Sequence, residues 1–206
     1  MTFTFDRLLL AGAAAGACLL PAAAAAQAVP AAGNRGVYVT QVGDSNVAFV
    51  RQSAPTASAT VTQTGDRNDA SVMQGGGGAA SAELAQTGDA NVARLAQAGD
   101  GTSVLVASQS GARNSLIAAQ TGNAGGLANV VLAQQEGNDN QIRLAQEGSD
   151  NQAILGQTGN GNALNAVQVD EGNRLTWTQD GNNLSGMTVT QMGGQTLQIT
   201  QTGPGR

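Results

Sequence analysis

The chain has 206 residues and a formal net charge of −5, with 14 acidic residues, 9 basic residues and no histidine. Aromatic residues make up 2% of the sequence and charged residues 11%, whereas glycine occurs 29 times. The apolar residues are mostly alanine, with valine and leucine, which suits a thin interior packed from small side chains. The arginines are scattered singly, and this excludes the basic stripe of a nucleic-acid-binding protein.

Residues 1–26 are predicted to be a signal peptide. A weakly positive start with Arg7 precedes an apolar run at 8–20 that is too short to span a bilayer. Small residues at 22–26 provide an Ala-x-Ala cleavage site, so we expect the mature chain to begin near Gln27. Lipid attachment at Cys18 is the alternative, but the branched apolar residue expected three positions earlier is missing. The rest has no transmembrane stretch, which predicts a secreted protein.

A six-residue motif, Gln-x-Gly-x-x-Asn, recurs along the chain. It occurs seven times, with glutamines at Gln41, Gln63, Gln86, Gln109, Gln135, Gln146 and Gln157, with glycines at Gly43, Gly65, Gly88, Gly111, Gly137, Gly148 and Gly159, and with asparagines at Asn46, Asn68, Asn91, Asn114, Asn140, Asn151 and Asn162. The spacing is kept once more at Gln168 and Asn173. Further glutamines continue the phase at Gln52, Gln74, Gln97, Gln120, Gln179, Gln191 and Gln201. A disordered Gly/Gln/Ser-rich chain would not hold this spacing.

The residues between each asparagine and the next glutamine alternate with period two. Asn46, Ala48, Val50 and Gln52 fall on one face of an extended strand, while Arg51 falls on the other. The same alternation follows the other asparagines, with Arg94 and Arg143 on the outward face. This pattern predicts strands with one buried and one wet face.

Short turns separate the strands. Val42-Gly43-Asp44-Ser45 is one example, in which glycine supplies a positive φ and we expect the aspartate to hydrogen-bond its own backbone. One strand and one turn make a unit of 11 residues, and two units make a rung of about 22 residues. The fold class is therefore predicted as all-β: a β-solenoid of about seven two-stranded rungs over 37–201, cross-β when polymerised, between a short segment at 27–36 and a tail at 202–206. Longer rim loops are expected at 75–78 and 123–128.

The repeated glutamines and asparagines lie on the buried face, where an unpaired amide would cost a few kcal/mol. Each amide has a donor and an acceptor, so it can bond to its copy in the rungs above and below. We interpret these residues as structural ladders that fix the register. The alternative is that they are exposed turn residues. Neither end of the array has an obvious cap, so head-to-tail addition of copies is expected to give a fibre.

The repeat Gln-x-Gly-x-x-Asn-x-Ala, with a further glutamine six residues after the asparagine, resembles that of the curlin family, the subunits of curli fibres. Ser103 and Ser185 match the leading serine of that repeat. The resemblance implies a bacterial extracellular amyloid, used in biofilm matrix and adhesion and exported by a dedicated outer-membrane pore. It also implies a partner curlin subunit. The sequence departs from the pattern at Ala57, Ala80 and Leu184, and it has more rungs than the five typical of the best-known members.

Three other kinds of protein share some features of this sequence. An enzyme is disfavoured because histidine and a mature cysteine are missing and the carboxylates lie mainly in turns; no catalytic residue, metal or cofactor is predicted. A calcium-binding β-roll has Gly-Asp pairs but a repeat of nine residues. A monomeric ice-binding solenoid needs a flat threonine array, which Thr176/Thr178, Thr188/Thr190 and Thr200/Thr202 suggest only near the C-terminus.

Overall fold

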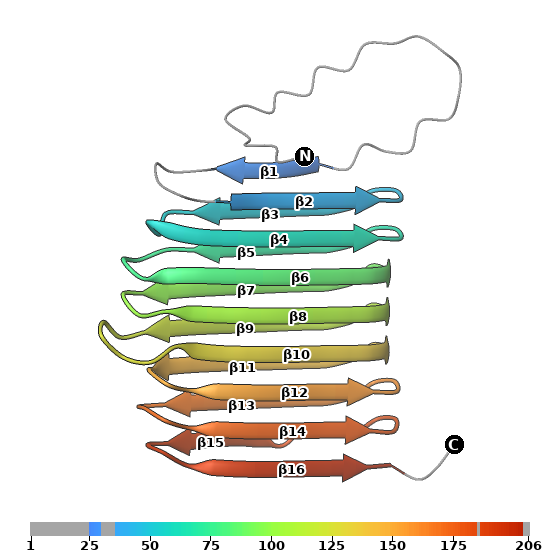
Figure 1. Cartoon of the computed structure of the whole chain (residues 1–206). Coiled ribbons are helices and arrows are strands. Elements are labelled where there is room, and N and C mark those ends of the chain that lie inside the picture. Colours follow the sequence, from blue (N-terminus) through green and yellow to red (C-terminus); the bar gives the residue numbers. More distant parts are fainter. Residues whose placement is uncertain (1–24, 30–35, 185, 204–206) are drawn as a thin grey trace, which may run out of the picture.

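The computed structural model describes residues 25–29, 36–184 and 186–203. Most of the predicted signal peptide, with Cys18, lies outside these ranges. The described chain is a column of stacked strands in two sheets that face each other (Figure 1). Among the described residues, no helix is long and apolar enough to cross a membrane.

Within the described residues, each sheet has eight strands, and all strand pairs are parallel. Sheet A consists, in order, of β1 (Ala25–Val29), β3 (Val47–Gln52), β5 (Asp69–Gln74), β7 (Val92–Gly99), β9 (Ser115–Gly122), β11 (Gln141–Gly148), β13 (Ala163–Val169) and β15 (Thr188–Met192). Sheet B consists of β2 (Gly36–Val42), β4 (Thr56–Thr64), β6 (Ala79–Asp89), β8 (Ser103–Ala112), β10 (Asn129–Asn138), β12 (Gln152–Thr158), β14 (Arg174–Asp180) and β16 (Thr196–Thr202).

The rungs are formed by consecutive strands, from β2–β3 to β14–β15, and β16 is a half rung after the seventh. Strands of neighbouring rungs pair in register: Gln41 is opposite Gln63, and Gln63 is opposite Gln86. The predicted β-solenoid and its rung length are confirmed. Because one rung stacks on the next at about 4.8 Å, the seven rungs stand about 34 Å tall.

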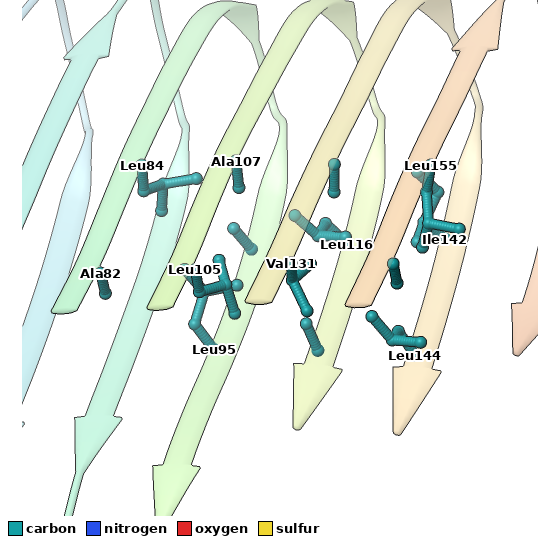
Figure 2. Close-up of a cluster of buried hydrophobic side chains, with 14 of the residues drawn as sticks. Ala82, Leu84, Leu95, Leu105, Ala107, Leu116, Val131, Ile142, Leu144 and Leu155 are labelled. Atoms are coloured by element: carbon teal, nitrogen blue, oxygen red, sulfur yellow. The ribbon is translucent and has the colours of Figure 1, made fainter. Parts of the chain in front are cut away.

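The interior between the sheets is thin and made of small side chains. Most strands contribute one alanine and one larger residue. Many neighbouring strands keep the same order, as at Ala48 and Ala70, but the order changes between β6, where Ala82 precedes Leu84, and β8, where Leu105 precedes Ala107. At this step Leu105 lies opposite Ala82, and the side chains from both sheets interdigitate (Figure 2). The alternating apolar residues of the sequence thus form the core.

We expect Leu105→Ala to lower the free energy of unfolding by roughly 2–5 kcal/mol, because Leu105 is fully buried and its removal leaves a cavity. Leu132 in the next strand of sheet B is the matched control, since its side chain is 46% exposed. For Leu132→Ala we expect a change within about 0.5 kcal/mol. Urea denaturation followed by circular dichroism measures both, and equal effects would contradict the assignment of the two faces.

The turns after the sheet-B strands use a glycine in the left-handed region, as at Gly43 with φ 108° and Gly65 with φ 105°. A second left-handed residue follows two positions later, for example Ser45 and Arg67. The expectation for the turn aspartates is wrong in one respect. Asp66 Oδ1 accepts from the Asp44 backbone N–H of the preceding rung, at 2.8 Å, rather than from its own turn. Because the rungs are stacked, the nearest free N–H belongs to the neighbouring turn.

Two features at the ends of the array were not expected. β1 pairs with β3, although no strand was predicted before residue 37. The last rung is also shorter than its sequence suggests: β15 begins at Thr188, and Met187 is 49% exposed rather than in line with the buried Val189. Leu184 takes the place of the asparagine that begins this arm in other rungs, so no side-chain amide continues the column there.

Candidate assembly site: the amide ladders and the open ends

Two glutamine columns run along the solenoid, one in each sheet. In sheet B, Nε2 of each glutamine donates to Oε1 of the glutamine in the next rung. The column runs through Gln41, Gln63, Gln86, Gln109, Gln135, Gln157, Gln179 and Gln201. In sheet A the column runs in the same direction through Gln52, Gln74, Gln97, Gln120, Gln146, Gln168 and Gln191. The Nε2 to Oε1 distances are 2.6–3.0 Å in both columns. Each buried amide thus has its partner in the adjacent rung.

The asparagines form columns at the other end of the strands, but their bonds differ from those of the glutamines. Asn46 Oδ1 accepts from the backbone N–H of Asn68, at 2.9 Å, and Asn46 Nδ2 donates to the Gly65 carbonyl in the next rung, at 2.6 Å. The same backbone bond links Asn68, Asn91, Asn114, Asn140 and Asn162. Each asparagine therefore ties the start of a strand to the turn of the neighbouring rung.

A shorter asparagine column lies in sheet B. It contains Asn129, Asn151 and Asn173, linked by backbone N–H to Oδ1 distances of 3.0 and 3.1 Å. The six-residue spacing pairs Asn129 with Gln135, but Ala124 replaces the motif glutamine, and Asn129 was left out of the predicted ladder residues. Towards the N-terminus the column continues as Ser103, Ala80 and Ala57. Ala57 and Ala80 pack with Ala54 in a small apolar cluster, which accounts for the two missing serines of the motif.

A third column was missed because it lies in the exposed turns. Asn138, Asn160 and Asn182 occupy one position of successive turns, with Asn138 Nδ2 to Asn160 Oδ1 at 3.0 Å and Asn160 Nδ2 to Asn182 Oδ1 at 3.1 Å. Asp66 and Asp89 take the equivalent position nearer the N-terminus and use Oδ1 only. The turns are therefore stacked as regularly as the strands.

Ion pairs also join neighbouring rungs at the surface. Arg113 Nη2 lies 2.7 Å from Asp139 Oδ2, and Arg94 and Arg174 pair with Asp69 and Asp150. The hydrogen bond from Arg113 lowers the pKa of Asp139 below its ordinary value. This pair contributes to stability above the ordinary carboxyl pKa, and the contribution is lost as the pH falls through the lowered pKa.

The two ends of the glutamine columns carry opposite groups. At the N-terminal end, Gln52 Oε1 is buried and accepts no hydrogen bond, and no described residue donates to Gln41 Oε1. At the C-terminal end, Gln201 Oε1 accepts from Gln179 and from the Trp177 indole, while no described residue accepts from Gln201 Nε2. One end therefore presents amide acceptors and the other presents an amide donor.

The end strands also leave main-chain edges and apolar side chains uncovered. In β16, Leu197 is 38% exposed, whereas its partner Leu175 one rung inside is 2% exposed. In β2, Val37 and Val39 are only partly buried against the core. Unpaired edges of this kind are templates for further strands.

The aspartates considered for calcium binding lie in or beside the turns, and the threonines considered for ice binding lie in different sheets. Among the described residues, no group of three or more acidic, histidine or cysteine side chains could hold a metal ion. Thr178 and Thr200 are neighbours in sheet B, but Thr188 and Thr190 belong to sheet A, so the threonines do not form one flat array.

The comparison with protein families identifies the repeat. The curlin associated repeat matches residues 36–74 and 129–169, which correspond to β2–β5 and β10–β13. Searches of curated proteins and of solved structures found no match. Residues 75–128 between the two matches carry the same glutamine and asparagine columns. Both matched segments consist of the Gln-x-Gly-x-x-Asn units that resemble the curlin repeat, so the chain contains curlin associated repeats.

Proposed function

We propose that this protein is a structural subunit of an extracellular, curli-like amyloid fibre that polymerises at the bacterial cell surface and supports biofilm matrix and adhesion. The observation that carries the proposal is the complementarity of the two ends. Gln41 Oε1 lacks a described donor at one end, and Gln201 Nε2 lacks a described acceptor at the other. A second copy placed head to tail would continue the sheet-B ladder with the same donor direction.

The geometry of the ends favours an open polymer over a closed oligomer. Both sheets are parallel and in register throughout the described chain. A copy added at the C-terminal end of another copy therefore exposes, at its own C-terminal end, the same surface for the next copy. A head-to-tail contact that does not close on itself generates a filament. The proposed polymer therefore has a direction, with all chains oriented alike.

The proposal includes the route to the surface. We expect export through the signal peptide predicted at 1–26. The curlin repeat supports passage through a curli-type outer-membrane assembly machinery and growth beside a partner curlin subunit. These steps concern residues and partners outside the described chain, and a secretion assay in cells that carry or lack that machinery tests them.

Thioflavin fluorescence of purified residues 27–206 at neutral pH tests the proposed assembly. We expect a lag followed by growth, a lag that shortens when fragments of finished fibres are added, and the same course in the presence of a calcium chelator. Sedimentation should show loss of soluble protein in parallel. A monomer that stays soluble at all concentrations, or assembly that requires calcium, would contradict the proposal.

The turn aspartates should slow this assembly, because like charges stack along one edge. Asp44, Asp66 and Asp89 occupy equivalent turn positions, and the Oδ1 atoms of Asp66 and Asp89 each accept a backbone N–H. Asparagine keeps that acceptor and removes the charge, as Asn138 and Asn160 already do. The triple change to asparagine should shorten the lag. An unchanged lag in the same thioflavin assay would refute a role of these charges.

A further inference from the structure

The two sheets have the same number of strands but are offset by one. Each sheet has eight strands. Sheet A extends one strand beyond the first rung, with β1, whereas sheet B extends one strand beyond the last rung, with β16 (Figure 1). The array therefore ends in a half rung on one sheet at its N-terminal end and in a half rung on the other sheet at its C-terminal end.

This offset determines how two copies can join. When a second copy is stacked below the first, its β2 must follow β16 in sheet B. At the height of β16, sheet A of the first copy has already ended with β15, which leaves one strand position empty between β15 and the β3 of the second copy. The second copy's β1 is paired with that β3 and lies in this position.

We propose that the joint between two copies is a composite rung, made of β16 from one copy and β1 from the next. The inference rests on the proposed head-to-tail assembly and specifies its contact. With the composite rung, both sheets continue through the joint without a gap, and each copy occupies eight strand positions, about 38 Å along the fibre. Without β1, sheet A would be interrupted once in every copy.

The residues that meet in sheet B match along the whole strand. Setting Gln201 opposite the next copy's Gln41, in the register of all other rungs, places Leu197 opposite Val37 and Ile199 opposite Val39. These are the partly exposed apolar side chains at the two ends. Gln201 Nε2 then has the acceptor Gln41 Oε1, and Thr200 lies opposite Thr40.

In sheet A the match involves the backbone of β1. Of the β1 residues left after the predicted cleavage, Ala28 is in register with Val50, an inward-facing position of β3 that is 0% exposed. β1 ends at Val29, opposite Arg51, which is one residue before Gln52, whose Oε1 accepts no hydrogen bond from the described residues. The sheet-A glutamine column is therefore interrupted at the joint, while the sheet-B column is continuous.

Four chains test the composite rung by seeded elongation, each grown on its own fibre fragments: residues 27–206, 36–206, 27–194 and 36–194. Cleavage before Gln27 would leave Gln27–Val29 of β1, so the first chain is the reference. Each single truncation leaves an empty strand position and unpaired backbone groups at every joint, and we expect elongation to slow about tenfold. The double truncation gives flush ends, and its rate should recover to within about threefold of the reference.

The axial repeat provides a second readout. Mass-per-length measurement should give about 38 Å per copy for 27–206 and about 34 Å for 36–194. Recovery in the double truncation shows that neither deletion acts by preventing folding. Unchanged elongation of 36–206, or a 36–194 chain that grows no faster than 27–194, would overturn the composite rung. Absence of fibres from 27–206 would overturn the proposed function and the composite rung with it.

Substitutions in β1 test the same contact at full length. Ala28 is in register with the buried Val50, whereas Gln27 is in register with the partly exposed Phe49. Ala28→Asp should slow seeded elongation about tenfold, because its register position is a buried one in β3, and Gln27→Asp should change it less than about twofold. Equal rates for the two variants would contradict the assigned register.

Discussion

A Gln109→Glu variant should fail to assemble at neutral pH. Gln109 is 1% exposed, and it lies between Gln86, which donates to its Oε1 at 2.8 Å, and Gln135, whose Oε1 accepts from its Nε2 at 2.9 Å. A carboxylate could accept from Gln86 but would set a negative charge against the Gln135 oxygen. Burial of an unpaired charge costs several kcal/mol. We expect the protein left soluble at the end of assembly to rise at least about hundredfold.

The pH dependence of this variant identifies the cause. Burial raises the pKa of the introduced carboxyl above its ordinary value of about 4.3. Its folded pKa then exceeds its unfolded pKa, so stability is lost above the ordinary pKa and recovers as the pH falls through that interval. A protonated carboxyl donates one hydrogen bond, and it can replace the lost bond to Gln135.

The matched control for the ladder is Ser108→Glu on the same strand, because Ser108 is exposed. It adds the same charge and should leave the soluble fraction within about threefold of the unmodified chain. A Gln109→Glu chain that assembles at neutral pH like the control would refute the glutamine ladder as a determinant of assembly.

Gly137→Ala is expected to have an effect of similar size. Gly137 has φ 113°, and an added Cβ would lie 1.9 Å from the Gly159 carbonyl oxygen in the next rung. That oxygen also accepts from Asn140 Nδ2, at 2.8 Å, so it cannot move without loss of this bond. Left-handed strain and the clash together should lower the free energy of unfolding by at least about 3 kcal/mol. Urea denaturation and the residual soluble concentration measure the loss.

Gly156→Ala provides the control for this change. Gly156 lies within β12, and a Cβ added there would meet nothing within 4 Å. Alanine in place of a strand glycine should be neutral or stabilise by up to about 1 kcal/mol. If both alanine variants behaved alike, the close stacking of the turns would be wrong.

The sequence predicted the solenoid because its spacing is dictated by the stack itself. A glutamine such as Gln63 must recur at the same position in every rung, because its hydrogen-bond partners are the equivalent glutamines of the neighbouring rungs. The sequence therefore repeats with the length of a rung. Strand alternation then assigned the buried face, as for Ala48 and Val50. Both signals are repeated so often that local exceptions do not hide them.

The parts that were not predicted lack this repetition. β1 lacks the repeat motif, since its Gln27 is in register with Phe49 rather than with a ladder glutamine, and only its pairing with β3 reveals the strand. The acceptor of the turn N–H groups was assigned to the wrong residue, because sequence does not distinguish a bond within a turn from a bond to the turn above, as at Asp66. The direction of the glutamine ladders depends on which amide group faces which neighbour, and only the three-dimensional structure defines this.

X-ray fibre diffraction from aligned fibres of residues 27–206, combined with seeding, tests directly whether copies continue one another's sheets. We expect a meridional reflection at about 4.7–4.8 Å and an equatorial one near 10 Å. We also expect that seeds of 27–206 remove the lag. A soluble, concentration-independent monomer, or an aggregate without the meridional reflection, would contradict the central claim that the ends of this solenoid join through its sheets.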